Sequence, residues 1–209
     1  IVNDFKTVTD ISITAVLSDR LATLIAADSD ITITGDKTAE DVLNEIADKF
    51  FNTKLKVSII ASLGTGDCLI VPVTDGIDFG FDIIENNNFY IDNSIGDNMR
   101  NVIMKRDEFV RDNNVYARYE AHMLMQDENG TTVCRIYRYA YKNDKEIELN
   151  SIDKWSNIPA ETIIPNVDRL LFGRIKCPTV NRENINSVQG VPITYGLDVA
   201  VTEAKDSYK

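Results

Sequence analysis

The sequence is poor in the residues that most often carry catalysis and metal binding. It has one histidine, His122, and three cysteines that lie far apart, Cys68, Cys134 and Cys177. Histidine is the usual general base near neutral pH, and zinc sites and disulfide frameworks need closely spaced ligands or paired cysteines. The spacing therefore argues against both kinds of site, and we expect reduced, mostly buried thiols.

Long apolar runs and an excess of positive charge are also missing. No apolar stretch approaches the roughly 18 residues that cross a bilayer, and no basic segment followed by an apolar one marks a secretory signal. The chain has 33 acidic and 22 basic residues, a net charge of −11. This balance disfavours binding of nucleic acid through a broad basic patch, but it does not exclude a surface past which DNA slides without adhering.

The composition is that of an ordinary soluble domain, with 209 residues of which 44% are hydrophobic. That length allows one sizeable core or one domain with an appendage. The chain begins at Ile1, without a methionine, and stops inside an expected helix. We therefore expect it to be a fragment of a longer protein.

The first third of the chain has helical periodicity. Apolar residues recur every three or four positions over residues 10–28. A second helix is expected from Thr38, which forms with Asp41 a pattern similar to a capping box. A third helix is expected from Asn52 or Thr53.

The stretch "SLGTGD", residues 62–67, raises the question of a phosphate-binding loop. The predicted order is helix, glycine and strand, whereas a dinucleotide fingerprint needs its glycines after a strand and before a helix, and no P-loop lysine follows. We therefore interpret Gly64 as the residue that ends the third helix, and Gly66 as the residue that lets the chain reverse into the next strand.

Strands dominate from residue 65 to about residue 180. Turns are expected at Gly76 and at the pair Asn129-Gly130, and a last helix is expected from about Ile193, within residues 190–209. We predict a single α+β domain over residues 1–209, in which residues 1–64 form helices that pack on a mostly antiparallel sheet with long hairpins.

The pair Asn129-Gly130 is a strong signal for a two-residue hairpin turn. Such a turn fixes the register of the two flanking strands. The opposed pairs would be Glu120 with Tyr139, His122 with Tyr137, and Leu124 with Arg135. The other face of the hairpin would carry Tyr119, Met123, Cys134 and Ile136.

Two groups of side chains in these strands admit a functional interpretation. Glu120 and His122 could form an acid–base couple, but a cross-strand ion pair of Glu120 with Arg135 or Arg138 is the simpler interpretation. The alternating tyrosines and arginines of "RIYRYAYK" could stack on nucleic acid, although they suit any half-exposed strand. The acids around "DGIDFGFDIIE" do not have EF-hand spacing. No catalytic, cofactor-binding or metal-binding residue is assigned.

Several segments, taken in order, resemble the N-terminal half of portal proteins from tailed phages and prophages of Gram-positive bacteria. They include "LSDRLATLIAADSDITITGD", "AEDVLNEIADKFFNTKLKVSIIASLGTGDCLIVPVTDG", "NNFYIDNS", "VYARYEAHML" and "LFGRIKCPTVNRENINSVQGVPITYGLDVAVTEAKDSY". "VYARYEAHML" is the best single match. "NNFYIDNS" lacks the proline of the corresponding family strand, and the last segment matches sparsely. The resemblance covers most of the chain by pattern and order.

The resemblance implies a non-catalytic structural subunit without a cofactor. Portal subunits form a ring, usually of twelve, at one capsid vertex, and double-stranded DNA is packaged and ejected through its channel without sequence readout. Terminase, capsid or scaffold, head-completion and tail proteins would be the other partners. The protein would lie in the virion, and in the host cytoplasm during assembly. The matching region forms the outer wing of the ring, before the stem.

Tyrosine is enriched at protein interfaces, and we therefore predict ring contacts through exposed members of a group of four tyrosines. These are Tyr116, Tyr137, Tyr139 and Tyr141. Two alternatives stay open. One is a non-catalytic α+β interaction module of another phage or cellular assembly. The other is an enzyme, with a nucleotide site at residues 64–67 or with Glu120 in an acid pair.

Overall fold

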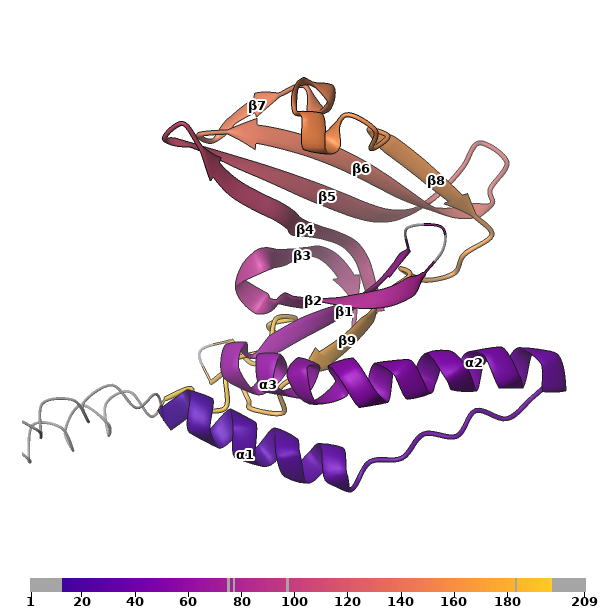
Figure 1. Cartoon of the computed structure of the whole chain (residues 1–209), viewed down its shortest axis with the longest axis vertical. Helices are drawn as coiled ribbons and strands as arrows, with labels where there is room; N and C mark the ends of the chain where they lie inside the picture. The colour runs from indigo at the N-terminus through magenta and orange to yellow at the C-terminus, as the bar shows by residue number, and fades with distance from the viewer. Residues whose placement is uncertain (1–12, 75, 77, 97, 183, 197–209) are drawn as a thin grey trace, which may run out of the picture. The chain divides into compact units, whose positions relative to one another are not determined.

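The computed structural model of this chain describes residues 13–74, 76, 78–96, 98–182 and 184–196 (Figure 1). The chain, expected as one domain, divides into two compact units. Unit 1 comprises Ile1–Asn86 and Phe172–Lys209, and unit 2 comprises Asn87–Leu171. Helices near the N-terminus and antiparallel sheets give the expected α+β fold. None of the helices in the described ranges is both long enough and apolar enough to cross a membrane.

Three α-helices form one part of unit 1: α1 (Ile13–Ala27), α2 (Lys37–Phe50) and α3 (Lys56–Thr65). A short π-helical turn, Phe51–Leu55, joins α2 to α3 without a break (Figure 1). Helix α1 packs against α3. Their shared core has four buried members and is completed by half-buried aliphatic residues. The buried members are Ala22, Ile59, Leu63 and Cys177.

The start of α2 differs from the prediction. The cap is Asp36, whose side chain accepts hydrogen bonds from the backbone N–H groups of Thr38 and Ala39. The capping box expected at Thr38 is therefore wrong, because the carboxylate two positions earlier already binds the free N–H groups. The break expected at Asn52 or Thr53 is also absent. Thr53 instead donates its hydroxyl to the carbonyl of Lys49 inside the continuous helix.

The end of α3 lies two residues beyond the predicted position. Gly64 is inside the helix, and Gly66 is the C-cap, with a left-handed φ of +98° and an N–H group that donates to the carbonyl of Ser62. A left-handed cap favours glycine because a Cβ atom is strained there. Gly76 also has a positive φ, +93°, and lies between the first two strands.

The sheet of unit 1 is antiparallel with strand order β2-β1-β9. Its strands are β1 (Asp67–Thr74), β2 (Phe79–Glu85) and β9 (Gly173–Lys176). Residues 193–196 form a turn, and the rest of the predicted final helix lies outside the described residues.

Unit 2 contains a larger antiparallel sheet, called the second sheet, with order β3-β4-β5-β6-β7 and with β8 also paired to β6 (Figure 1). Its strands are β3 (Phe89–Ile95), β4 (Asn98–Arg111), β5 (Asn114–Gln126), β6 (Thr132–Lys142), β7 (Lys145–Ile147) and β8 (Glu161–Pro165). A short 3-10 turn, Asn86–Asn88, precedes it, and two more, Leu149–Ser151 and Asp153–Trp155, lie between β7 and β8.

The β5–β6 hairpin forms where it was predicted, but its register differs by one residue. Of the pair Asn129-Gly130, only Gly130 has a positive φ, +77°, whereas a two-residue type I′ turn needs positive φ at both residues. The longer loop is closed by the N–H of Asp127, which donates to the carbonyl of Thr131. The pairs across the hairpin are Glu120 with Arg138, His122 with Ile136, and Leu124 with Cys134.

Side chains alternate along a strand, so a shift of one residue changes which side chains of β6 lie on the same face as a given residue of β5. Cys134 and Ile136 therefore share a face with Glu120, and not with Tyr119 and Met123 as predicted. Tyr119 is instead opposite Tyr139.

A β-bulge in β4 changes which residues of that strand lie on each face of the sheet. Lys105 pairs with Tyr119 and Asp107 pairs with Arg118, so Arg106 is an extra residue between them. A bulge bends its strand and redirects the following side chains. Beyond it, odd-numbered residues such as Phe109 face the same side as Tyr116.

Candidate functional site

The second sheet has two chemically different faces. One, called the charged face, carries Glu120 and its ion-pair partners. The other, called the tyrosine face, carries three of the four tyrosines predicted as interface residues, together with one that was not predicted. These are Tyr137, Tyr139, Tyr141 and Tyr119.

The carboxylate of Glu120 is the centre of a buried cluster on the charged face. One of its oxygens accepts from Arg118 Nη1 at 2.8 Å and from Arg138 Nε at 3.0 Å. The other lies 3.4 Å from Arg106 Nε and 3.3 Å from His122 Nε2. The bulge in β4 brings Arg106 to this cluster. Of the two partners predicted for Glu120, the structure has Arg138. The other, Arg135, pairs with Glu161.

The cluster keeps Glu120 ionised. Burial by itself would raise the pKa of this carboxyl, but the hydrogen bond with His122 and the charges of Arg106 and Arg118 outweigh it, and the pKa falls to about 2. A carboxyl with such a pKa holds no proton to donate at neutral pH and is a weak base. This argues against the acid–base hypothesis for Glu120 and His122 and favours a structural role.

Arg138 extends the cluster to the neighbouring segment. Its Nη1 donates to the carbonyl of Pro159 at 2.9 Å and to the hydroxyl of Thr162 at 2.8 Å. The same side chain thus links β5, β6 and the start of β8. An arginine with partners on three segments favours one register of the strands that it joins.

Tyr116 lies on the charged face, apart from the other predicted tyrosines. Its ring stacks on Phe109, with centroids 5.2 Å apart, and Phe109 meets Trp155 edge-on at 5.4 Å. The indole N–H of Trp155 donates to Asp107 at 2.9 Å. Tyr116 is half-buried and packs within this aromatic group, and its role in ring contacts stays a prediction.

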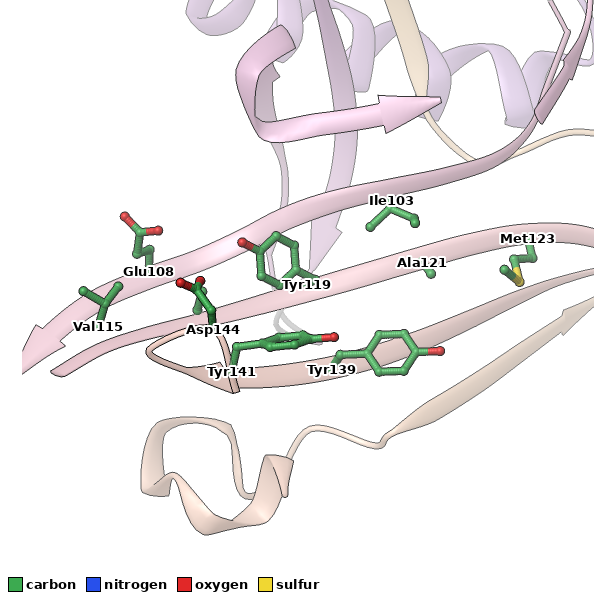
Figure 2. A pocket seen from close by; sticks show the side chains of 10 residues that line it. Ile103, Glu108, Val115, Tyr119, Ala121, Met123, Tyr139, Tyr141 and Asp144 are labelled. Carbon is green, nitrogen blue, oxygen red and sulfur yellow. The ribbon is translucent and has the colours of Figure 1, made fainter. Parts of the chain in front are cut away.

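The tyrosine face contains a hollow of about 510 Å³, called the tyrosine trough (Figure 2). Ala117 and Ala121 lie in it, and both are buried among taller side chains. Tyr119 from β5 and Tyr139 and Tyr141 from β6 line it, as Figure 2 shows. Small residues in one strand beside large ones in the next leave a depression in the surface of a sheet.

The lining of the trough is mainly apolar, with acidic groups at one end. Ile103 and Met123 are among its apolar members, and Ile103 is 38% exposed. Glu108 and Asp144 lie near Val115, at the end away from Met123 (Figure 2). Burial and the nearby charge of Glu146 raise the pKa of Tyr141, which therefore stays a neutral phenol at neutral pH. Tyr137 is not in the trough and borders a second hollow with Glu146 and Glu161.

The glycine-rich stretch of unit 1 is occupied by the chain itself. Asp67 is fully buried. Its carboxylate accepts hydrogen bonds from Nε of Arg174 at 2.9 Å, from Nη2 of Arg174, and from the N–H of Gly190 at 3.1 Å. Arg174 also donates to the carbonyl of Val188. This arrangement favours an internal anchor over the phosphate-binding hypothesis for residues 64–67, because the arginine already binds an anion.

Metal and thiol chemistry find little support among the described residues. No group of three or more His, Cys, Asp or Glu side chains there is arranged to hold a metal ion. Cys68, Cys134 and Cys177 are free and buried, as predicted. Burial and the charge of Asp67 raise the pKa of the Cys68 thiol to about 12, so it is not a reactive thiolate.

The sequence interpretation did not find the alanines, Tyr119 or the acidic end of the trough. The alternation in "VYARYEAHML" placed Ala117, Tyr119 and Ala121 on one face of a strand. Only the register shows that this face also carries Tyr139 and Tyr141.

No model of a known protein family matches this chain, and no curated protein matches it significantly. The resemblance to portal proteins therefore rests on the order of the segments named above.

Proposed function

We propose that this chain is the wing region of a structural subunit of a phage portal ring. The full ring would form the conduit for DNA packaging and ejection at one capsid vertex. It would also be the attachment point for terminase and for head-completion and tail proteins. The observation that carries the proposal is the open tyrosine face of the second sheet, together with the collinear resemblance.

The tyrosine face has the character of a protein interface. Exposed apolar side chains gather on it, including Val110, Val115 and Tyr139, which are 70%, 42% and 37% exposed. Isolated apolar residues are common on protein surfaces, whereas a contiguous group around a hollow marks an interaction site. Tyrosines around such a hollow are typical anchors of binding energy.

The charge of the chain is compatible with a DNA conduit. A protein that binds DNA tightly neutralises phosphates with many lysines and arginines. A chain with a net charge of −11 has a weak non-specific affinity for the duplex. This property suits a body past which DNA must move in both directions.

An interaction module of another assembly is the second candidate. The tyrosine face favours it as much as it favours a portal subunit, because a hollow with aromatic walls does not specify the symmetry of the complex. An enzyme receives less support, since the carboxylates of Asp67 and Glu120 are both held in internal ion pairs.

Negative-stain electron microscopy of the protein as its gene encodes it, after gel filtration, tests the proposal. We expect rings of about a dozen subunits with a central channel. If the protein stays monomeric alone, it is co-expressed with the major capsid and scaffold proteins of its phage. Closed dimers, or monomers even under co-expression, would contradict the portal proposal and leave the interaction module.

A further inference from the structure

Helix α1 has an apolar side that is exposed among the described residues of its unit. Its inner side carries the buried Ser18 and Ala22. The outer side carries Val16, Leu17 and Leu24, and Leu24 is 63% exposed. A helix that is apolar around most of its circumference is normally covered on both sides.

One positive charge lies within this outer side. Arg20 is exposed and stands three residues after Leu17 and four before Leu24, so the three side chains form one row. The other charged residue of α1, Asp19, is paired with Lys56 at 2.9 Å. We call Val16, Leu17, Arg20 and Leu24 the outer row of α1; it is apolar with one cation.

The tyrosine trough has the complementary chemistry. Its lining is apolar over Tyr119 and Tyr139, and it carries the carboxylates of Glu108 and Asp144 at one end. Glu108 already contacts Lys105 Nζ at 3.1 Å in its own chain, but its side chain is still 48% exposed. The low floor at Ala117 and Ala121 gives a projecting leucine a place to enter. Ridges of a helix dock where the facing surface has a depression between larger side chains.

We propose that the outer row of α1 in one copy of this chain docks into the tyrosine trough of the next copy, with Arg20 beside Glu108 and Asp144. This inference rests on the proposed ring function and names the contact that would build it. The two surfaces are different and lie on different units of the chain. Repeated head-to-tail from copy to copy, this contact is heterologous and generates a ring or an open filament.

A second copy fits better than an unrelated partner because one chain supplies both surfaces with opposite charge. The net charge of −11 on each copy opposes association. That repulsion is largely screened beyond about 8 Å at physiological salt. The ion pair of Arg20 with Glu108 and Asp144 then sets the orientation of α1 in the tyrosine trough. The apolar residues of the outer row supply most of the affinity.

The test uses two variants of the protein that each lose one surface. Leu24→Glu places a negative charge in the outer row, and Tyr139→Lys removes an apolar wall of the trough and adds a charge that repels Arg20. Both positions are exposed, so we expect normal folding by circular dichroism. The control variant is Leu43→Glu on α2, which is also exposed and lies outside both surfaces. Sedimentation velocity measures the size distribution of each.

We expect the wild type and Leu43→Glu to form oligomers, and each of the other two variants alone to associate at least about tenfold more weakly. An equimolar mixture of Leu24→Glu and Tyr139→Lys should associate more strongly than either variant alone, at least to one-to-one dimers, because the intact row of one variant meets the intact trough of the other. A wild type that is monomeric at the highest attainable concentration would overturn the proposal. A mixture that stays monomeric, or single variants that oligomerise normally, would overturn it too.

A charge exchange gives an independent check if either variant fails to fold. Arg20→Glu should weaken association, and adding Glu108→Arg and Asp144→Arg to the same chain should restore it. Failure of the restored chain to associate would count against the assigned pairing. If Leu24→Glu and Tyr139→Lys each still form rings with a channel, the portal proposal stands and this contact is overturned. If the two variants associate with each other but the wild type forms no rings with a channel, the contact stands and the portal proposal is overturned.

Discussion

The backbones of Gly66 and Gly190 lie directly against each other, although 124 positions separate them along the chain. A Cβ atom on Gly190 would lie 1.9 Å from the carbonyl oxygen of Gly66. The N–H of Gly190 also donates to Asp67, the residue after Gly66. The stretch "SLGTGD" is therefore the place where the C-terminal segment of unit 1 attaches to the end of α3.

Gly66 and Gly64 should respond in opposite ways to alanine. Gly66→Ala adds a side chain at a φ of +98°, 2.5 Å from the backbone of Val191, and should lower the free energy of unfolding by more than about 2 kcal/mol. Gly64→Ala, inside α3 with its nearest contact 3.8 Å away, should raise it by about 0.5–1 kcal/mol. Urea denaturation of both variants measures the difference. Equal effects would show that the helix ends elsewhere.

Removing the charge of Asp67 should destabilise unit 1. Asp67→Asn leaves the guanidinium of Arg174 buried without its anion, and breaking a buried pair in this way costs about 3–5 kcal/mol. The matched control is Asp168→Asn, which breaks the exposed pair with Arg169 and should have no measurable effect. Thermal unfolding followed by circular dichroism compares the two. A variant of Asp67 as stable as the control would contradict the anchor role.

Stability should fall at acid pH because of Glu120. Its pKa is about 2 in the folded protein and about 4.5 in an unfolded chain. The unfolded state therefore binds the proton first as the pH falls, and the stabilisation present above about pH 4.5 is lost progressively towards pH 2. The total is up to about 3 kcal/mol for a shift of this size. Urea denaturation at a series of pH values measures it.

Two variants separate Glu120 from the other carboxylates. Glu120→Gln should remove most of the pH dependence in that window and destabilise the protein at pH 7, because the three arginines around it lose their shared anion. Glu161→Gln, which breaks a more exposed pair with Arg135, should leave the pH dependence in place. A wild-type pH profile in Glu120→Gln would contradict the assignment.

Trp155→Phe should lower the free energy of unfolding by about 1–2 kcal/mol, because Asp107 loses the hydrogen bond from the indole N–H while the aromatic packing on Phe109 is largely kept. Asp107 retains its contact with Lys154 at 2.7 Å. The control is Lys154→Met, at an exposed position, which should change stability less. Circular dichroism in urea measures both variants. The single tryptophan of the wild type also gives a fluorescence signal for the opening of this group.

The local elements were predictable because they depend on near neighbours. The apolar period of residues 10–28 predicted a helix that the structure has at Ile13–Ala27. The turn predicted within "QDENG" lies between β5 and β6. Element ends were less accurate. The cap of α2 is Asp36, whereas the sequence pattern indicated Thr38. The π-helical turn continues the helix through Asn52, where a break was expected. Competing caps differ by about 1 kcal/mol, which pattern reading cannot rank.

The candidate site was predictable only within single strands. Tyr137, Tyr139 and Tyr141 share a face because side chains alternate, and the sequence states this directly. Tyr116 lies on the other face from these three, and the sequence could not show this because its face relative to β6 depends on how β5 is aligned with β6. That alignment follows from one dihedral angle in the loop, because Asn129 does not adopt the positive φ that a two-residue turn requires.

The sequence by itself determined the order of helices and strands, the acidic charge and the alternation of large and small residues in β5. The tertiary structure decided which residues meet: Arg174 with Asp67, Arg106 with Glu120 across a bulge, and the alanines of β5 with the tyrosines of β6. Local preferences fix backbone conformation over a few residues. Contacts between distant residues depend on register and on chain closure, where one inserted residue moves a whole set of side chains to the other face.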